Sequence, residues 1–237
     1  MKKELAPKLN NNNSSILKVG NWIIDKAYGG FANFSKAEDL ANTYINDPRY
    51  PNPEDKINAL IKFETAKNFS TGFITGIGGF STLPITIPAS IGASWLLQAR
   101  MVAAIAKIYG YNLDDERGKT TILCVIIGQD IKELLKQKGI TIAKELTYVA
   151  ISKLPAEALL KINQAVGFRL VAKAGEKGVI SLSKIVPFID GFIGGTIDGI
   201  SCIFATKAAK KVFAPRIDEK LENEINITDI SIEEMNS

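Results

Sequence analysis

The residues best suited to chemistry in this 237-residue chain are three consecutive acids, Asp114, Asp115 and Glu116. Carboxylates are the ligands that hard cations such as Ca²⁺ and Mg²⁺ prefer, so a metal site is one hypothesis. Side chains at adjacent helix positions point in different directions, however, and three of them cannot converge on one ion. Acids in the first turn also stabilise a helix through its dipole. We therefore interpret this cluster as a helix N-terminus, and we predict neither a metal site nor a cofactor.

Serine and lysine occur at two spacings that could support nucleophilic catalysis, Ser181-x-Ser183-Lys184 and Ser152-Lys153. A serine hydroxyl needs a neighbouring base to become a nucleophile. The chain contains no histidine, which is the commonest general base at neutral pH, so a lysine or a carboxylate would have to serve. Both spacings are expected by chance in a lysine-rich chain. An enzyme that uses carboxylates alone is therefore the weakest of three functional hypotheses.

The two cysteines, Cys124 and Cys202, are far apart, and each lies in an apolar helical pattern. We expect two buried thiols in a reducing compartment, with a disulfide as the open alternative. The N-terminal sequence MKKELAPKLNNNNSS lacks the apolar core of a signal peptide. We therefore expect a cytoplasmic location rather than secretion.

The elements that would position these side chains are organised around residues 68–99, because no charged residue lies between Lys67 and Arg100. Burying an unpaired charge is costly, so such a stretch is typical of a deep protein core or of lipid. Pro84 and Pro88 interrupt the helical repeat, which predicts two arms joined at a corner. The arm at residues 69–83 would be about 22 Å long, shorter than the roughly 30 Å hydrocarbon core of a bilayer. A buried or re-entrant apolar hairpin fits better than a membrane crossing.

Helix signals around this Gly/Pro-rich apolar hairpin predict an all-α fold, a single multi-helix domain at residues 14–215. We predict a disordered leader at residues 1–13, and an acidic, flexible tail at residues 216–237. The first predicted helix runs from Ser14 or Ser15 to Tyr28, the second begins at a capping box of Ser35 and Glu38, and the third runs from Asn52-Pro53 into the hairpin. The fourth runs from Ala89 to Tyr109 with Gly110 as its C-cap, and the fifth begins at an Asn112 cap. Further helices are predicted over residues 141–152, 156–173 and 188–213.

Glycines recur at helical spacing in two predicted helices, at Gly191, Gly195 and Gly199 in the last one and at Gly72 and Gly76 in the first arm. Glycines stacked on one helix face admit close approach of a partner helix. This pattern serves tight packing in a soluble domain and packing in lipid equally, and both interpretations stay open. Both require the glycines to face protein.

Two charges, Arg100 and Asp198, lie in apolar helices that tolerate an unpaired charge poorly. Asp198 lies within one turn of Gly195, on the side that the glycines present to a partner helix. We predict that Asp198 forms a buried pair with Arg100, and Lys107 is the second choice of cation. The alternative is that each charge faces solvent.

Residues 132–184 are strongly basic, with ten Lys or Arg against four Glu. These lysines fall on amphipathic patterns with aliphatic faces, and few aromatic residues are available for base stacking, so we do not expect nucleic acid as a partner. An anionic lipid surface suits the composition, since each lysine near it contributes about 1 kcal/mol. A merely solvated face is the alternative.

Residues 71–115 resemble the signature of the EcsC protein family, in which a TG-x-x-x-G-x-GG run, two prolines, a Q-x-R-M segment and an IA-x-x-YG-x-(L)DD ending occur in this order. The matching positions are Thr71, Gly72, Gly76, Gly78, Gly79, Pro84, Pro88, Gln98, Arg100, Met101, Ile105, Ala106, Tyr109, Gly110, Asp114 and Asp115. Residues 186–213 resemble the closing glycine-rich helix of that family more loosely. The family is named for a member encoded beside the components of an ABC transporter, so the resemblance implies a transporter-linked membrane role and no catalytic residue.

Together these patterns favour a non-enzymatic, cytoplasm-facing helical protein that is peripheral to a membrane, partly inserted in it or bound to a membrane complex. The alternative is a soluble all-α protein whose glycine-lined interior holds an apolar ligand such as a lipid chain. Membrane association predicts that the protein sediments with membranes and is released by detergent or high salt. A soluble binder predicts a clear supernatant and a co-purifying lipid.

Overall fold

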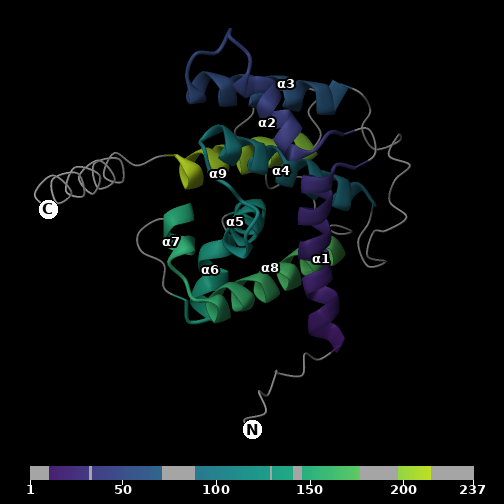
Figure 1. The fold of residues 1–237 in the computed structure, drawn as a ribbon. Helices are drawn as coiled ribbons and strands as arrows, with labels where there is room; N and C mark the ends of the chain where they lie inside the picture. The colour runs from purple at the N-terminus through teal and green to yellow at the C-terminus, as the bar shows by residue number, and fades with distance from the viewer. Residues whose placement is uncertain are drawn as a thin grey trace, which may run out of the picture.

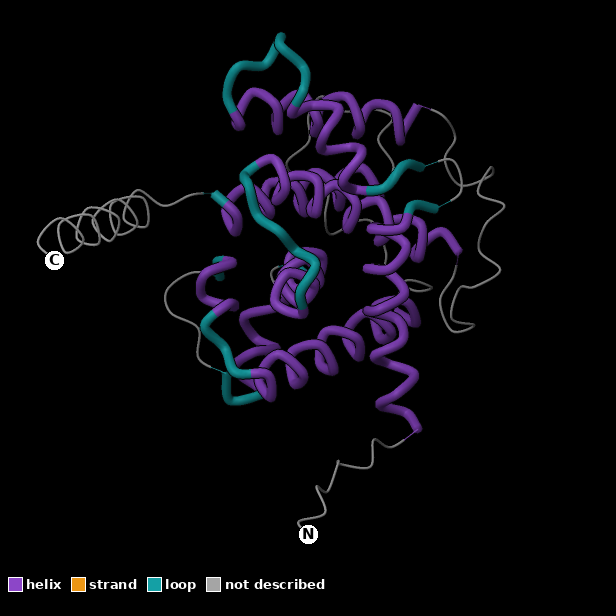
Figure 2. The backbone as a smooth tube through the Cα atoms, in the orientation of Figure 1, coloured by secondary structure: helices purple, strands orange, loops and turns teal. Residues whose placement is uncertain are grey.

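The chain folds into helices throughout the part that the computed structural model describes, which comprises residues 11–31, 34–70, 89–128, 130–140, 146–176 and 197–214. Within these ranges there are nine helices and no strand (Figure 1), and turns and loops join them (Figure 2). The prediction of an all-α fold is confirmed. The helices are α1 (Asn11–Gly29), α2 (Ala37–Ile45), α3 (Pro53–Ser70), α4 (Ala89–Ile108), α5 (Glu116–Ile127), α6 (Asp130–Gln137), α7 (Tyr148–Ser152), α8 (Ala156–Glu176) and α9 (Ile197–Phe213).

Helix α4 is the centre of the molecule and closely matches the predicted helix over residues 89–109. Every residue from 92 to 106 is buried. A helix that is apolar on all sides must be covered on all sides, and α1, α2, α3, α5 and α9 all pack against α4. In Figure 1, α2 and α3 lie above α4 and α5 lies below it. The neighbours of α4 therefore shield it from water around its circumference.

One continuous core unites the nine helices. Its buried side chains come from every helix, and α1 packs against both α4 and α8. Figure 1 shows α1 passing beside α8 in the lower part of the molecule and reaching up to the level of α4. The aliphatic face predicted for the helix at residues 156–173 is formed on α8 by Leu159, Ile162, Val166 and Leu170, which are buried against this core. The predicted single domain is confirmed by this shared core.

The predicted capping box at the start of α2 is wrong. Lys36 occupies the N-cap position, and no side chain caps the helix there. Ser35 lies one residue too early, and its oxygen atoms accept hydrogen bonds from Arg100 instead. Glu38 contacts Lys107 across the surface. A tertiary contact with a buried cation has replaced the local cap that the sequence pattern predicted.

The start of α5 also differs from the prediction, because Asp115 and not Asn112 caps the helix. The Asp115 carboxylate accepts a hydrogen bond of 2.8 Å from the Gly118 amide. The Asn112 side chain accepts from the Asp114 amide at 3.2 Å and so shapes the turn before the cap. Asp115 thus caps the helix, and the Asp114 amide forms part of the turn before it. Two residues of the acidic cluster therefore serve the helix start, as the sequence pattern predicted in outline.

Two further helices differ from prediction in their bounds. Of the helix predicted over residues 141–152, the structure describes residues 146–152, in which the short α7 begins after Thr147. The Thr147 hydroxyl accepts a hydrogen bond from the Ala150 amide at 3.1 Å and caps this helix, and residues 141–145 lie outside the described part. Helix α1 begins at Asn11 rather than at Ser14 or Ser15, and it ends as predicted before Gly30, which has a φ of 85°.

Gly118 is a position where the fold leaves no space for a side chain. A Cβ atom built there would lie 2.5 Å from the Leu113 Cα and 2.7 Å from the Leu113 carbonyl oxygen. Because these are backbone contacts, no side-chain rotation relieves them. At Gly29, by contrast, a Cβ atom meets nothing within 4 Å.

We expect Gly118→Ala to lower the free energy of unfolding by about 1–3 kcal/mol through overpacking against Leu113. The matched control is Gly29→Ala, which should change it by less than about 1 kcal/mol and in the stabilising direction. Urea denaturation followed by circular dichroism measures both. Equal midpoints for the two variants would contradict the close approach of Leu113 to α5.

Candidate functional site

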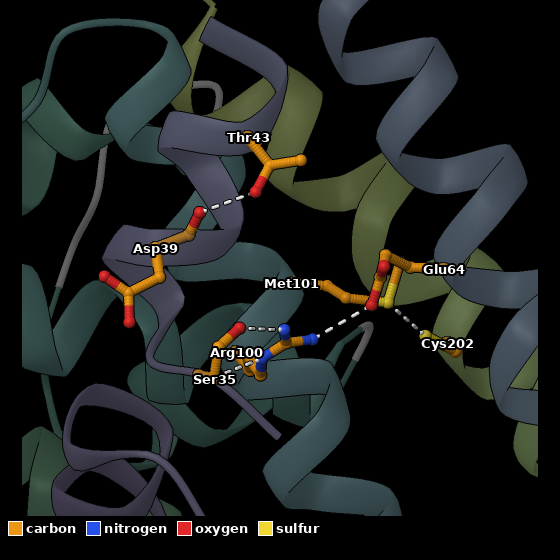
Figure 3. A network of polar contacts seen from close by, with 7 residues as sticks. All are labelled: Ser35, Asp39, Thr43, Glu64, Arg100, Met101 and Cys202. Carbon is orange, nitrogen blue, oxygen red and sulfur yellow. Dashed lines mark hydrogen bonds and ion pairs between the residues drawn. The ribbon is translucent and has the colours of Figure 1, made fainter. Parts of the chain in front are cut away.

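A buried ion pair between Arg100 of α4 and Glu64 of α3 is the main polar feature of the described interior. The Arg100 Nη1 atom lies 3.0 Å from the Glu64 Oε2 atom. Only 3% of Arg100 and 7% of Glu64 is exposed to solvent. Figure 3 shows the two side chains reaching toward one another from neighbouring helices. The pair neutralises charge in a region where an unpaired charge would cost several kcal/mol.

The remaining face of the guanidinium group contacts the segment before α2. Arg100 Nε donates to the Ser35 carbonyl oxygen at 2.7 Å, and Nη2 donates to the Ser35 hydroxyl at 2.9 Å. The guanidinium carbon also lies 5.5 Å from the centre of the Phe34 ring, within cation–π range. One side chain therefore joins three parts of the chain, which are α3, α4 and the α1–α2 connection.

The electrostatics of this cluster do not provide an activated nucleophile. Burial, and next the neighbouring Glu64 carboxylate, together raise the pKa of Tyr44 to about 12, so the phenol stays neutral at physiological pH. Ser35 faces a guanidinium group, which accepts no proton and cannot act as a base. The geometry is that of a structural clamp between helices.

The position of this clamp along the chain is informative. Glu64 precedes the charge-free stretch that begins after Lys67, and Arg100 is the first charged residue after it. Their ion pair holds α3 and α4 together at the two ends of this stretch. Glu64, shortly before the apolar segment, and Arg100, directly after it, thus neutralise each other. Neither of these two charges faces lipid or an apolar interior without a partner.

The carboxylate that contacts Arg100 in the described part of the chain is Glu64, whereas the sequence pattern favoured Asp198. Asp198 lies in α9, but its side chain is outside the described residues, so that pairing stays a prediction. A signal for Glu64 was present, because it falls at helical spacing from Ile57 and Leu60, which are fully buried. A carboxylate on a buried helix face requires a cation.

Lys107, the second-choice cation, forms a different pair. Its Nζ atom lies 2.5 Å from the Glu38 Oε1 atom, with 38% and 60% of the two side chains exposed. The Lys107 ammonium group lowers the pKa of Glu38 through this hydrogen bond and its charge. The pair joins α4 to α2 at the surface and leaves the buried position to Arg100.

The tyrosine and glycine of the family-like ending close helix α4. Gly110 has a φ of 92°, its amide donates to the Lys107 carbonyl, and the Tyr111 amide donates to the Ala106 carbonyl. This is the Schellman arrangement that glycine favours at a helix C-terminus. The Gly110 prediction is confirmed.

The side chain of Tyr109 ties the same helix end to two others. Its hydroxyl donates to Glu54 at the start of α3, and Lys210 of α9 lies 2.6 Å from the other Glu54 oxygen. Lys210 also donates to Asn58 at 2.9 Å. The Lys210 and Tyr109 hydrogen bonds lower the pKa of Glu54, and burial followed by the Glu54 contact raises the pKa of Tyr109. This cluster joins the ends of three helices.

The other motif residues that the structure describes have equally local partners. Gln98 is buried and donates to the Ser94 hydroxyl one turn earlier, at 3.1 Å. Asp115 caps α5, and Glu116 lies 3.2 Å from Lys119. Within the described ranges, no group of three or more His, Cys, Asp or Glu side chains could hold a metal ion.

Both cysteines are free and buried, as predicted, so no disulfide joins them. Burial raises the pKa of Cys124 to about 12, so this thiol stays protonated. The Cys202 Sγ atom lies 3.2 Å from the Met101 Sδ atom, between α9 and α4 (Figure 3). Cys202 therefore packs as part of the α4–α9 contact.

Several predicted residues lie outside the described part of the chain, and the structure does not test them. The incoming arm of the predicted hairpin from residue 71 onward and the proline corner lie outside the described residues, whereas the outgoing arm is the start of α4. The side-chain surroundings of Asp198 and Gly199 are likewise outside. The residues beyond the described ranges are Gly72, Gly76, Gly79, Pro84, Pro88, Gly191 and Gly195. None of the helices that can be examined combines the length and the hydropathy that a membrane crossing requires.

Comparison with known proteins bears on nearly the whole chain. The model of the EcsC protein family matches residues 2–217. The resemblance first seen over residues 71–115 is therefore confirmed and extends well beyond that block. Comparison with curated proteins and with solved structures gives no match.

We expect Arg100→Ala to lower the free energy of unfolding by about 3–5 kcal/mol, because it leaves the Glu64 carboxylate buried without its cation. The double variant Arg100→Leu with Glu64→Leu should recover much of this loss, since it removes both charges. Urea denaturation measures each variant.

The matched control is Lys107→Ala, which breaks the exposed pair with Glu38 and should shift the midpoint far less. A double variant no more stable than Arg100→Ala would contradict the stranded-charge explanation and would assign the stability to the Ser35 contacts instead.

Proposed function

The chain belongs to the EcsC protein family, and from that premise we propose that it is a non-enzymatic helical protein that associates with a membrane surface or a membrane complex. The observation that carries the proposal is the outward face of α8, where large apolar side chains and lysines lie together. The proposal places the protein at the cytoplasmic side of the membrane. It leaves the buried Arg100 cluster as a structural element.

The outward face of α8 differs from an ordinary solvated helix face. Leu160 is 43% exposed and Phe168 is 63% exposed, while the opposite side of the helix is buried in the core. The two positions are separated by two turns, or about 12 Å along the axis. Lys161 is exposed beside them. Aromatic and aliphatic side chains interspersed with lysine are typical of helices that lie in the membrane interface.

Helix α6 and the turn after it lie next to α8 and carry three exposed lysines, Lys132, Lys136 and Lys138. The two helices pack together, and Arg169 of α8 lies 3.2 Å from Asp130 of α6. Among described residues from 130 to 172, the exposed lysines outnumber the exposed glutamates five to two. The lysines are Lys132, Lys136, Lys138, Lys153 and Lys161, and the glutamates are Glu133 and Glu157. We call this region the α6–α8 face, defined by these lysines together with Leu160 and Phe168.

Anionic lipid is the surface that best complements the α6–α8 face. Each lysine near such a surface contributes about 1 kcal/mol, and apolar side chains that enter the headgroup region add the hydrophobic term. The interior of the described part supports the non-enzymatic half of the proposal, because its polar cluster joins helices and presents no base to a nucleophile. A contact between the glycine-rich helices of this chain and a membrane partner remains compatible with this surface role.

We expect the protein to sediment with vesicles that contain anionic lipid, to be released as salt rises, and to bind neutral vesicles poorly. Phe168→Ala should weaken binding about tenfold, since it removes an inserted aromatic ring worth about 1–2 kcal/mol. Vesicle co-sedimentation at low and high salt measures these effects.

The matched control is Phe204→Ala on α9, which removes a phenylalanine of nearly equal exposure outside the α6–α8 face. It should leave vesicle binding unchanged. Equal losses in both variants would contradict the assigned face, and equal binding to neutral and anionic vesicles would contradict the electrostatic part. Protein that stays in the supernatant with a co-purified lipid would favour a soluble binder of an apolar ligand instead.

A further inference from the structure

We propose that the acidic segment at residues 216–237 docks on the α6–α8 face of its own molecule and competes there with an anionic surface. The competition rests on the proposed membrane function, whereas the docking does not. Two observations carry the inference: the charge and apolar content of the segment complement the face, and the preceding helix ends beside α7, which leads into α8.

The composition of the segment matches the face in two respects. It carries seven acidic and two basic side chains, and the acids alternate with aliphatic residues. The face presents five exposed lysines together with the exposed side chains of Leu160 and Phe168. Acidic groups can therefore meet the lysines while aliphatic groups cover the apolar pair. The segment offers the same two kinds of contact as an anionic membrane interface.

The end of α9 places the segment close to the face. Phe213 is the last residue of α9, and its ring centre lies 6.0 Å from that of Tyr148 in α7. Only residues 153–155 separate α7 from the start of α8. Figure 1 shows the end of α9 and helix α7 on the same side of the molecule. The acidic segment thus begins beside α7, the short helix that precedes α8 in the chain.

The segment is also long enough to cover the face. Helix α8 contains 21 residues, which corresponds to a length of about 32 Å. About ten residues of extended chain span that distance at roughly 3.3 Å each. The acids of the segment lie at positions 218, 219, 222, 224, 229, 233 and 234. Four of these seven acids fall within the first ten residues of the segment, and the other three follow by residue 234. Chain length does not limit docking in the same molecule.

A zero-length carbodiimide cross-linker tests docking in the full chain, because it joins a carboxylate to a lysine only when the two are in contact. We expect cross-links from the segment to Lys132, Lys136, Lys138, Lys153 or Lys161, identified by mass spectrometry. Lys62, Lys207 and Lys211, which are exposed on α3 and α9, form the comparison set. The Lys107–Glu38 pair, separated by 2.5 Å, is the internal positive control.

A mixture of isotopically labelled and unlabelled protein separates links within one molecule from links between molecules. Links within one molecule to the α6–α8 lysines support the proposal. With the Lys107–Glu38 link present, three results would overturn it: no link from the segment, links only to the comparison set, or links only between molecules.

Competition is tested with a full-length variant in which the seven acids of the segment are replaced by Asn or Gln. If the segment covers the face about nine-tenths of the time, this variant should bind anionic vesicles about tenfold more tightly than the parent. Unchanged vesicle affinity alongside the expected cross-links would overturn the competition and keep the docking. Cross-links with no vesicle binding by either protein would instead overturn the proposed membrane function.

Discussion

The buried contact between Arg100 and Glu64 is the constraint on which the rest of this fold depends. Helix α4 is covered on all sides, and Arg100 is the one charged residue within its fully buried stretch. Such a helix can be enclosed only if a neighbour supplies a carboxylate, because an unpaired buried charge is costly. Glu64 supplies it from α3, and Ser35 accepts the remaining hydrogen bonds. The position of α3 and that of the α1–α2 connection are both set by this one guanidinium group.

The family motif gains a physical meaning from these contacts. Gly110 closes α4, Tyr109 ties that end to α3 and, through Glu54, to α9, and Asp115 starts α5. These motif residues have partners that join or end helices, and Gln98 contacts Ser94 within α4. The described part of the motif therefore contributes to the scaffold.

Interior and surface follow opposite rules in this protein. In the described interior, charge is confined to a pair whose members neutralise each other. On the surface, the α6–α8 face combines five exposed lysines with the exposed side chains of Leu160 and Phe168. Large apolar groups left in water among like charges are a departure from the interior rule, and such patches commonly mark interaction sites. The proposed membrane function uses this surface, whereas the clamp serves the stability of the fold.

The sequence by itself determined the features that depend on residues within about four positions of each other. Gly110 stops α4 and Asn52 caps α3, since its side chain accepts from the Asp55 amide at 2.9 Å, as the local patterns predicted. Only the tertiary structure decided that Ser35 serves Arg100 rather than its own helix, and that Glu64 is the carboxylate beside that cation. Periodicity shows which face of a helix is buried, but not which distant segment covers it. That choice depends on how all nine helices pack, so only the folded chain reveals it.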